Sequence, residues 1–528
     1  MAEYGERQAQ FADQMSDVEA LMWNVEKDPW LSSTMATVVI TDQPVDPVRL
    51  HRRLASGAAS IARLRARVEP GLGRLTAPRW QPDPEFDLGY HVRRIALPAP
   101  GDQATLYEVA GRIIEDPFDR TRPLWQFVVV DGMADGRGAL IVKLHHSVTD
   151  GLGALRLAEQ YMDKDRQATG RVDADVNLDA VIAADLAQLR RGPDQAPSPD
   201  RPAGGAGHIA GGAAHMAGGA AQAARRWAGD AMVAMADPTR LTQLGESLVT
   251  SLRQGAHQAD TAEAPSASPL WARRSRRRVL RTLELDLATV KAAAKASGGS
   301  VNDFFLAGTA LAAGRYHQRS GLALEQVTAS FVVSTRGKDE VAGNAFRPVK
   351  ATIPTGITAS ADGADGVGAA RASLVAEVHT VLANRRAEVG PGAGLLASLA
   401  GAVNLMPTSV VTRLARAQAA GIDFATSNVR AAPFPVYIAG AKVVATYPVG
   451  PVAGTAFNLT MMSYCDGLFL ALHADPVAVQ RPDELLACLS EAFNELLAAV
   501  APRPKRSAAS RPRRTPSPSS ARRRGTPP

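Results

Sequence analysis

Apolar residues in the first half of the chain form short runs that alternate with helical patterns. Residues 125–130 (WQFVVV) and 139–144 (ALIVKL) lie on either side of a Gly- and Asp-rich segment, which predicts two strands joined as a hairpin with a long loop. Beyond residue 151 the apolar positions recur at helical spacing, at Leu152, Leu155, Ala158 and Met162. Residues 145–150 should therefore connect a strand to a helix.

The residues before this hairpin predict further strand and helix. Residues 35–41 (MATVVIT) are typical of a strand. Asp46 and Pro47 form an N-cap followed by a proline at the first helical position, and later apolar residues extend the predicted helix to about Val68. Mixed strand and helix indicates an α/β fold, and we expect a first domain over residues 1–185.

The second half repeats this mixed patterning. Residues 279–287 alternate as a strand, and Ser300 with Asp303 fits the capping box of a helix over residues 301–316. Residues 465–467 (CDG) are typical of a hairpin turn. The remaining predicted elements are strands at residues 327–334, 436–438, 442–446, 456–464 and 468–473, and helices at residues 367–386 and 484–500. We expect a second α/β domain over residues 276–501.

Composition changes between the two halves. Residues 186–275 are rich in Ala, Gly and Pro, which predicts a long linker that is partly helical at residues 227–252. An arginine cluster at residues 273–278 (RRSRRR) closes the linker. Such a cluster could meet coenzyme phosphates or a membrane, but a solvated boundary is the interpretation we favour.

The net charge of +7 comes from the end of the chain. Residues 502–528 hold nine basic and no acidic residues, so residues 1–501 carry a net charge of −2. The Pro-, Ser- and Arg-rich composition predicts a disordered tail. It could bind anionic lipid headgroups or nucleic acid by counterion attraction, or stay solvated. We expect no specific nucleic acid partner.

Cysteine and hydropathy patterns exclude several classes of protein. The two cysteines, Cys465 and Cys488, form no CxxC pair, which excludes a disulfide framework and a cysteine zinc site and fits a reducing compartment. The polar, acidic start of the sequence predicts no signal peptide. The longest charge-free stretch, residues 389–412, contains Pro391 and Pro407. We expect a buried helix there, with a surface helix that dips into a membrane as the alternative.

The connection after the hairpin contains the candidate chemistry. Side chains alternate across a strand, so His146 should continue the apolar face of Val142 and Leu144, whereas His145 should share its face with Lys143. A sheltered neutral imidazole can act as a general base near pH 7, which favours His146 for that role. No metal site is expected.

Two structural alternatives stay open for these residues. A histidine in an apolar row is often a hydrogen-bonded core residue, so His146 could be structural. Asp150 could be the N-cap of the helix that follows.

Several sequence blocks occur in a characteristic order. They are Met15-Ser16-Asp17, Pro123-Leu124-Trp125, His145-His146 with Asp150-Gly151, Ser300-Val301-Asn302-Asp303, Ser334 and Arg336 with Gly343 and Asn344, residues 426–429 (TSNV), and residues 447–451 (YPVGP). With these blocks, over roughly residues 11–501, the chain resembles the bacterial wax ester synthase/diacylglycerol acyltransferase family of His-His-x-x-x-Asp-Gly acyltransferases. The His-His motif alone also occurs in chloramphenicol and carnitine acyltransferases and in peptide condensation domains, so the ordered set is the more specific signal.

The resemblance implies two chloramphenicol-acetyltransferase-like α/β domains, joined by the linker, with a tunnel between them. Acyl-CoA would be a co-substrate, with no further cofactor, and diacylglycerol or a fatty alcohol the acceptor. His146 would be the general base beside His145, Asp150 would hold the loop by pairing with an arginine, and Gly151 would let the backbone pass close to substrate. The implied substrate-binding residues are Asn302 (an oxyanion donor), Asp303, Pro123, Leu124, Trp125, Ser427 and Asn428.

One block departs from the family pattern. Residues 430–433 (RAAP) stand where the family usually has Pro-Gly-Pro after Ser-Asn-Val, which leaves the preferred chain length open. A condensation-type acyltransferase and a weakly active or non-enzymatic lipid-binding protein are the other functions considered. Because both substrates are apolar, we expect a cytoplasmic protein attached peripherally to the inner face of the membrane or to lipid droplets.

Overall fold

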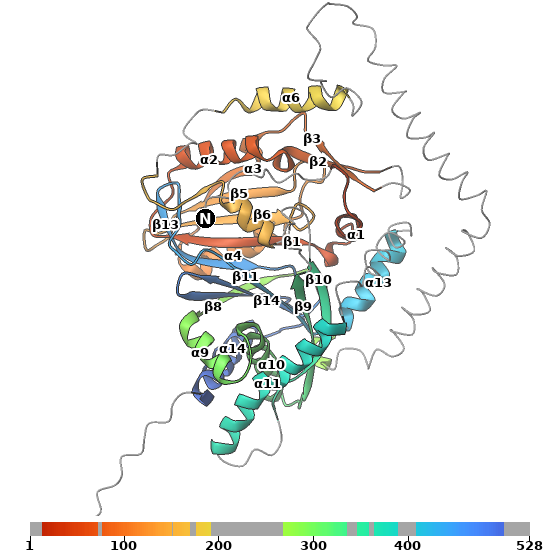
Figure 1. The fold of residues 1–528 in the computed structure, drawn as a ribbon, viewed down its shortest axis with the longest axis vertical. Coiled ribbons are helices and arrows are strands. Elements are labelled where there is room, and N and C mark those ends of the chain that lie inside the picture. Colours follow the sequence, from red (N-terminus) through yellow and green to blue (C-terminus); the bar gives the residue numbers. More distant parts are fainter. Residues whose placement is uncertain are drawn as a thin grey trace, which may run out of the picture.

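The computed structural model describes residues 13–71, 77–149, 151–168, 176–191, 268–334, 346–357, 364–388 and 408–500. These residues form two large β-sheets with helices on their outer sides (Figure 1). The predicted linker helix at residues 227–252, the tail and most of the charge-free stretch lie outside the described residues.

The first sheet takes strands from both halves of the chain. In the part of the chain that the structure describes, its seven strands run in the order β4 (Val92–Ala96), β5 (Trp125–Asp131), β6 (Gly138–His145), β1 (Thr34–Thr41), β13 (Ala441–Val449), β12 (Tyr437–Ile438) and β7 (Met162–Asp163). The predicted hairpin is confirmed, because β5 and β6 pair antiparallel. Strands β12 and β13 come from the range expected for the second domain, yet β13 pairs with β1.

The second sheet consists of six strands within the described residues. Their order is β10 (Phe346–Pro354), β9 (Gln326–Ser334), β11 (Phe424–Arg430), β14 (Phe457–Tyr464), β15 (Gly467–Ala474) and β8 (Val279–Asp286). The hairpin turn predicted at residues 465–467 joins β14 to β15. A small third sheet pairs β2 (Ala66–Glu69) with β3 (Arg79–Pro82).

Helices cover the outer sides of the two sheets (Figure 1). α2 (Pro47–Ser60), α3 (Leu88–His91) and α6 (Leu178–Arg191) lie over the first sheet, and α9 (Leu287–Ala296), α10 (Val301–Arg319), α11 (Ala364–Glu388) and α14 (Pro482–Val500) lie under the second. α4 (Gln103–Glu115) contacts both β1 and β8, so it joins the two units. The other helices are α1 (Asp17–Val25), α5 (Gly151–Ala158) and α13 (Thr408–Ala420).

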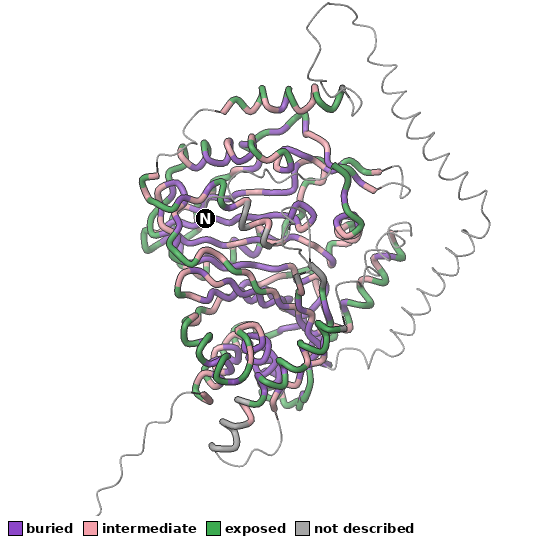
Figure 2. The backbone as a smooth tube through the Cα atoms, viewed as in Figure 1, coloured by how far each residue is buried: buried purple, intermediate pink, exposed green. Residues whose placement is uncertain are grey.

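Each sheet has its own hydrophobic core, and most strand residues are buried (Figure 2). The first core includes Val443 and Tyr447 of β13, so a strand from the second half of the chain packs into the first unit. The second forms around α10, whose inward residues Phe304, Phe305 and Leu311 are fully buried. A two-unit α/β fold follows, as predicted.

Two helix predictions are wrong at their ends. The helix that begins at Pro47 with Asp46 as its N-cap stops at Ser60, and residues 66–69 pair with β3 instead of continuing it. The helix after the histidines stops at Ala158, and Met162 lies in β7, paired with Ile438 of β12. In both places pairing with another strand, β3 nearby in the chain and β12 far along it, outweighs the local helical spacing.

Candidate active site

The two histidines lie where the central strand β6 ends. β6 pairs with β5 on one side and β1 on the other, and the backbone bonds continue into the turn. The N–H of His145 donates to the carbonyl of Leu124 at 3.0 Å, and the N–H of His146 donates to that of Ser33 at 3.0 Å. The backbone of both histidines is therefore fixed by neighbouring segments, as a reacting group requires.

The imidazole of His145 has both nitrogens engaged. The backbone N–H of Ser147 donates to Nδ1 at 3.0 Å, so the ring proton belongs on Nε2. Nε2 lies against Oε2 of Glu26, a hydrogen bond that reaches from the end of α1. The rings of Trp23 and Phe118 contact His145 edge-on, each with its centroid 6.4 Å away. His145 is therefore held in one tautomer in an apolar enclosure.

Glu26 is a site residue that the sequence analysis missed. It follows α1, whose start at Ser16 has the capping box with Glu19, so the first sequence block sets the helix that places Glu26. Ser32 donates its Oγ–H to Oε1 of Glu26 at 2.8 Å. Burial raises the pKa of Glu26, but His145, Ser32 and the charge of Arg120 outweigh it and hold the pKa below its usual value. Glu26 is therefore an ionised acceptor at neutral pH.

The prediction that His146 is the more sheltered histidine is wrong. His145 is only 1% exposed and Lys143 only 2%, whereas His146 is half-buried beyond the end of the strand. The reason is that β6 is covered on both faces. Lys143 extends its ammonium to the end of α4, where it donates to the carbonyl of Ile113 at 2.8 Å and to that of Asp116. Burial lowers the pKa of Lys143 to about 8.

The Pro-Leu-Trp block adjoins the histidines through the β5–β6 pairing. Trp125 lies opposite Leu144 and is buried, and its indole N–H donates to the carbonyl of Leu64 at 2.7 Å. The ring of His91 stacks on Trp125 with a centroid distance of 4.4 Å, and burial lowers the pKa of His91 to about 4. These contacts fix the orientation of the indole. The block is thus next to the site, although neither Pro123 nor Leu124 is exposed.

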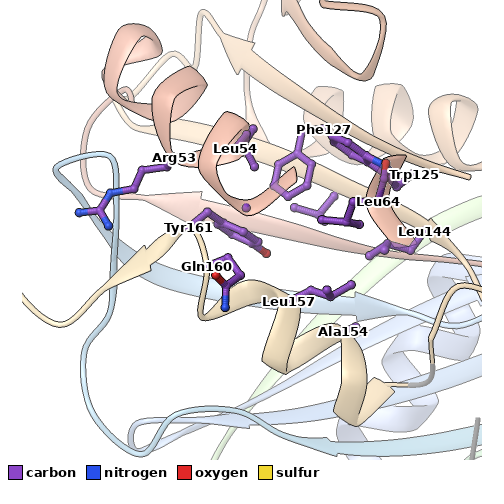
Figure 3. Close-up of a pocket in the computed structure, with 12 residues that line it drawn as sticks. Arg53, Leu54, Leu64, Trp125, Phe127, Leu144, Ala154, Leu157, Gln160 and Tyr161 are labelled. Carbon is purple, nitrogen blue, oxygen red and sulfur yellow. The ribbon is translucent and has the colours of Figure 1, made fainter. Parts of the chain in front are cut away.

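A cavity lies on the other face of β6 (Figure 3). About 430 Å³ between its walls is not filled by protein atoms, and part of this space is open to solvent at the mouth. Strands β5 and β6 form one wall, helices α2 and α5 form others, and Tyr161 reaches across toward Phe127 (Figure 3). Their rings meet edge to face, with centroids 4.9 Å apart.

Ser427 and Asn428 lie on β11 of the second sheet. β11 pairs with β14 along its whole length but with β9 only over residues 424–426. The pairing between β11 and β9 therefore ends before Ser427. Ser427 is half-buried and Asn428 is exposed. Helix α5, which follows the histidine motif, contacts β11. The Ser-Asn-Val block is therefore brought next to the element that follows the histidines.

Asn302 and Asp303 lie in a different place, at the start of α10. Asp303 is fully buried and forms the predicted capping box with Ser300, and its Oδ2 also accepts from Nδ1 of His379 at 2.8 Å. α10 packs against α9, α11, α14, β9 and β10, on the side of the second sheet that faces away from β6 (Figure 1). The oxyanion role of Asn302 stays a prediction.

Asp150, Arg336, Gly343 and Asn344 lie outside the described residues, and Gly151 is the first residue of α5. Of the arginine cluster, Arg274 donates to the carbonyl of Gly454 at 3.2 Å and Arg278 to that of Ser275 at 2.8 Å, so part of it is structural.

Among described side chains, no group of three or more that could bind a metal is present. No described helix has the length and apolarity needed to span a membrane.

Comparison with protein families decides the affiliation. Residues 15–305 match the model described as the wax ester synthase/diacylglycerol acyltransferase catalytic domain, and residues 342–497 match the WS/DGAT C-terminal domain. The chain belongs to the wax ester synthase/diacylglycerol acyltransferase family. It is therefore an acyltransferase by family, and the predicted resemblance is confirmed.

Relatives of this family in Mycobacterium tuberculosis match over nearly the whole chain. One protein, provisionally named a diacylglycerol O-acyltransferase, is 30% identical over 500 residues, which is 94% of each chain. Another with the same kind of name is 29% identical over 515 residues, covering 92% of this chain and 97% of that protein.

Solved structures show the same fold. The wax ester synthase/diacylglycerol acyltransferase from Marinobacter aquaeolei VT8 superposes with a TM-score of 0.58 at 18% identity, covering 92% of this chain and 99% of that one. The first condensation domain of the calcium-dependent antibiotic synthetase gives a TM-score of 0.55 at 16% identity, covering 93% and 97%. The predicted two-domain α/β architecture is confirmed, whereas the tunnel between the domains stays a prediction.

Proposed function

We propose that this protein transfers a long-chain acyl group from acyl-CoA to the hydroxyl of diacylglycerol, forming triacylglycerol. The observation that carries the proposal is the His145–His146 pair at the end of a central strand, two residues of which, Val142 and Leu144, line an apolar cavity. The names of the mycobacterial relatives support diacylglycerol as the acceptor. A long-chain alcohol, which would give a wax ester, is the second acceptor we propose.

His146 is the proposed general base because of what His145 already does. Nδ1 of His145 accepts from Ser147, and its Nε2–H is donated to Glu26, so neither nitrogen is available to a substrate hydroxyl. His146 is half-buried and fixed through its backbone bond to Ser33. The engaged nitrogens of His145 thus support His146 as the general base. The sequence favoured the same residue, but on the expectation that it would be the more buried histidine.

The proposed reaction follows from the chemistry of the thioester. Acyl-CoA is already activated, so the remaining task is to make a neutral hydroxyl nucleophilic. His146 takes the hydroxyl proton as the oxygen attacks the acyl carbon. The tetrahedral intermediate then collapses, the carbon–sulfur bond breaks, and the proton passes from the imidazolium to the departing thiolate. The acyl group moves directly to the alcohol without a covalent enzyme intermediate.

The oxyanion of the intermediate requires hydrogen-bond donors, which are worth about 3–4 kcal/mol when well placed. Asn302 is the donor proposed from the family resemblance. Its position at the start of α10 gives this role no support, so the mechanism does not depend on it. If Asn302 is the donor, Asn302→Ala should lower kcat roughly 100-fold or more. A change of less than threefold would remove it from the mechanism.

The experiment that tests the proposed function is an acyl-transfer assay with purified protein. Radiolabelled palmitoyl-CoA is supplied with dioleoylglycerol or hexadecanol, and the products are separated by thin-layer chromatography. Formation of triacylglycerol that stops in His146→Ala protein is the expected result. Turnover with amines or carrier-bound acyl groups but not with lipid alcohols would favour a condensation-type enzyme. Lipid binding without any turnover would favour a non-enzymatic role.

We further propose that the reaction takes place at a lipid surface on the cytoplasmic side, because acceptor and product are both insoluble in water. Attachment would be peripheral. Sedimentation of the protein with vesicles that contain diacylglycerol tests this, and protein that remains in the supernatant at low and high salt would contradict it.

A further inference from the structure

The loop between α4 and β5 is fixed to the strand that ends in the histidines. At the start of the loop, the ammonium of Lys143 donates to the carbonyl of Asp116. At its end, the N–H of His145 donates to the carbonyl of Leu124 at 3.0 Å. Between these two bonds, the ring of Phe118 contacts the ring of His145 edge-on. A side chain that extends from this loop therefore has a defined position relative to His145.

Arg120 extends from the middle of this loop to the end of α1. One of its terminal nitrogens donates to the carbonyl of Trp23 at 2.7 Å, and its Cζ lies 3.4 Å from the centroid of the Trp23 indole. Carbonyls in the last turn of a helix lack partners within the helix, and the helix dipole favours a cation there. α1 has no basic residue of its own in its last turn. Arg120, 97 positions further along the chain than Trp23, therefore caps this helix.

The end of α1 carries two side chains that contact His145. The ring of Trp23 meets the imidazole edge-on, with the centroids 6.4 Å apart, and Glu26 at the C-cap accepts from Nε2 of the same ring. The charge of Arg120 also acts on Glu26. Burial raises the pKa of this carboxyl, but the bonds from His145 and Ser32 and the charge of Arg120 lower it below its usual value. One guanidinium thus acts on both α1 residues that contact His145.

These contacts distinguish Arg120 from an arginine that waits for a substrate phosphate. Its side chain is half-buried. Its guanidinium already has the indole of Trp23 against it, a carbonyl acceptor and the charge of Glu26 nearby. A phosphate would have to displace these contacts and remove the cap from α1. The geometry therefore favours a role within the protein over a direct contact with acyl-CoA.

We propose that Arg120 is a positioning residue for acyl transfer, which acts on the proposed base through the end of α1 and His145. By holding the last turn of α1, it keeps Trp23 and Glu26 in place against the imidazole of His145. The backbone of His145 continues directly into His146, so a shift of α1 displaces the proposed base. The inference rests on the proposed function, because its readout is turnover at His146.

Arg120→Met and a matched control test this role. Methionine keeps an unbranched apolar stem but removes the guanidinium. The control is Arg122→Met, since Arg122 lies in the same loop but places its guanidinium over the ring of Tyr90, with Cζ 4.4 Å from the centroid. The kcat and the KM for palmitoyl-CoA are measured with dioleoylglycerol fixed, for wild type and both variants. Circular dichroism melts identify variants that do not fold.

Arg120→Met should lower kcat by about tenfold or more, because a displaced base loses rate, while KM stays within about twofold of wild type. Arg122→Met should leave both constants unchanged. A raised KM with an unchanged kcat overturns the proposal, because Arg120 would then bind the substrate. An unchanged kcat and KM, or an equal fall of kcat in the control, also overturns it. Wild-type protein that transfers no acyl group refutes the proposed function itself.

A double-mutant cycle tests the route through Glu26. Residues that act through one another give losses that do not add in free energy, so the kcat of the double variant Arg120→Met with Glu26→Ala should lie within about twofold of the lower single variant. A loss equal to the product of the two single losses would show that the residues act independently, which contradicts the proposal. If Arg120→Met does not fold, Arg120→Lys replaces it in both measurements with the same outcomes, because it keeps a cation at this half-buried position but lacks the planar guanidinium.

Discussion

Glu26 accepts a hydrogen bond from His145, although the two residues are 119 positions apart in the chain. The bond joins the end of α1 to the end of β6, and on its other side the His145 ring accepts from the N–H of Ser147. His146 lies between His145 and Ser147 in the sequence, so the residues on both sides of it are held by these bonds. The first histidine of the motif therefore acts as a brace that fixes the turn containing the second.

Replacing Glu26 should loosen this brace. Glu26→Ala leaves the buried Nε2–H of His145 without its acceptor, which should lower the free energy of unfolding by about 1–3 kcal/mol and lower kcat more than it raises KM. Glu26→Gln keeps an acceptor oxygen, so it should recover most of kcat. Equal kcat losses in the two variants would show that the charge, not the hydrogen bond, matters. Chemical denaturation and steady-state kinetics provide the data.

The contribution of Glu26 to stability should depend on pH. Its pKa is lowered in the folded protein from an ordinary value of 4.5, so the contribution is complete above pH 4.5 and is lost as the pH falls through the folded pKa. The difference in free energy of unfolding between wild type and Glu26→Gln should be constant at pH 6–7 and shrink below pH 4.5. A difference that grows on acidification contradicts this.

Lys143 should also make stability rise with pH, but in the alkaline range. Its folded pKa of about 8 lies below the ordinary 10.5, so between these values the unfolded chain binds more protons than the folded one. Stability relative to Lys143→Met should therefore rise between pH 8 and 10.5, with a limiting slope of about 1.4 kcal/mol per pH unit. It should be flat from pH 6 to 7. If the difference in free energy of unfolding between wild type and Lys143→Met does not change with pH across the alkaline range, the ammonium is not desolvated.

Asp303 should affect folding more than catalysis. Asp303→Ala removes the capping box of α10 and the bond from His379, so we expect a loss of about 1–3 kcal/mol in stability. The kcat of the folded fraction should stay within about twofold, because α10 lies behind the second sheet. His379→Ala is the milder control, since that side chain is half exposed. A large fall in kcat with an unchanged melt would place Asp303 in the reaction.

Local patterns predicted the elements and the histidine turn but not their long-range partners. The apolar runs at residues 125–130 and 139–144 are strands because each buries a continuous set of side chains. Nothing local indicates that β13 pairs with β1 across 400 residues, since a strand leaves its partner unspecified. The helix expected to reach Val68 ends early for the same reason, as residues 66–69 have a strand partner.

The environment of the histidines also depends on distant contacts. Alternation along β6 assigned Lys143 to a polar face, but α4 covers that face and its terminal carbonyls accept from the ammonium. Glu26 stands in a polar turn with no motif of its own, so only the fold shows that it meets His145. In contrast, the capping box of Ser300 and Asp303 was predicted because both residues act within one helical turn.

The most direct test of the account is the pair His146→Ala and His145→Ala, measured for palmitoyl transfer to dioleoylglycerol together with a circular dichroism melt. His146→Ala should lose at least about 100-fold in kcat while melting as wild type does. His145→Ala should lose both stability and activity, because it removes the brace between Glu26 and Ser147. Undiminished turnover by folded His146→Ala protein would contradict the central claim that His146 is the general base.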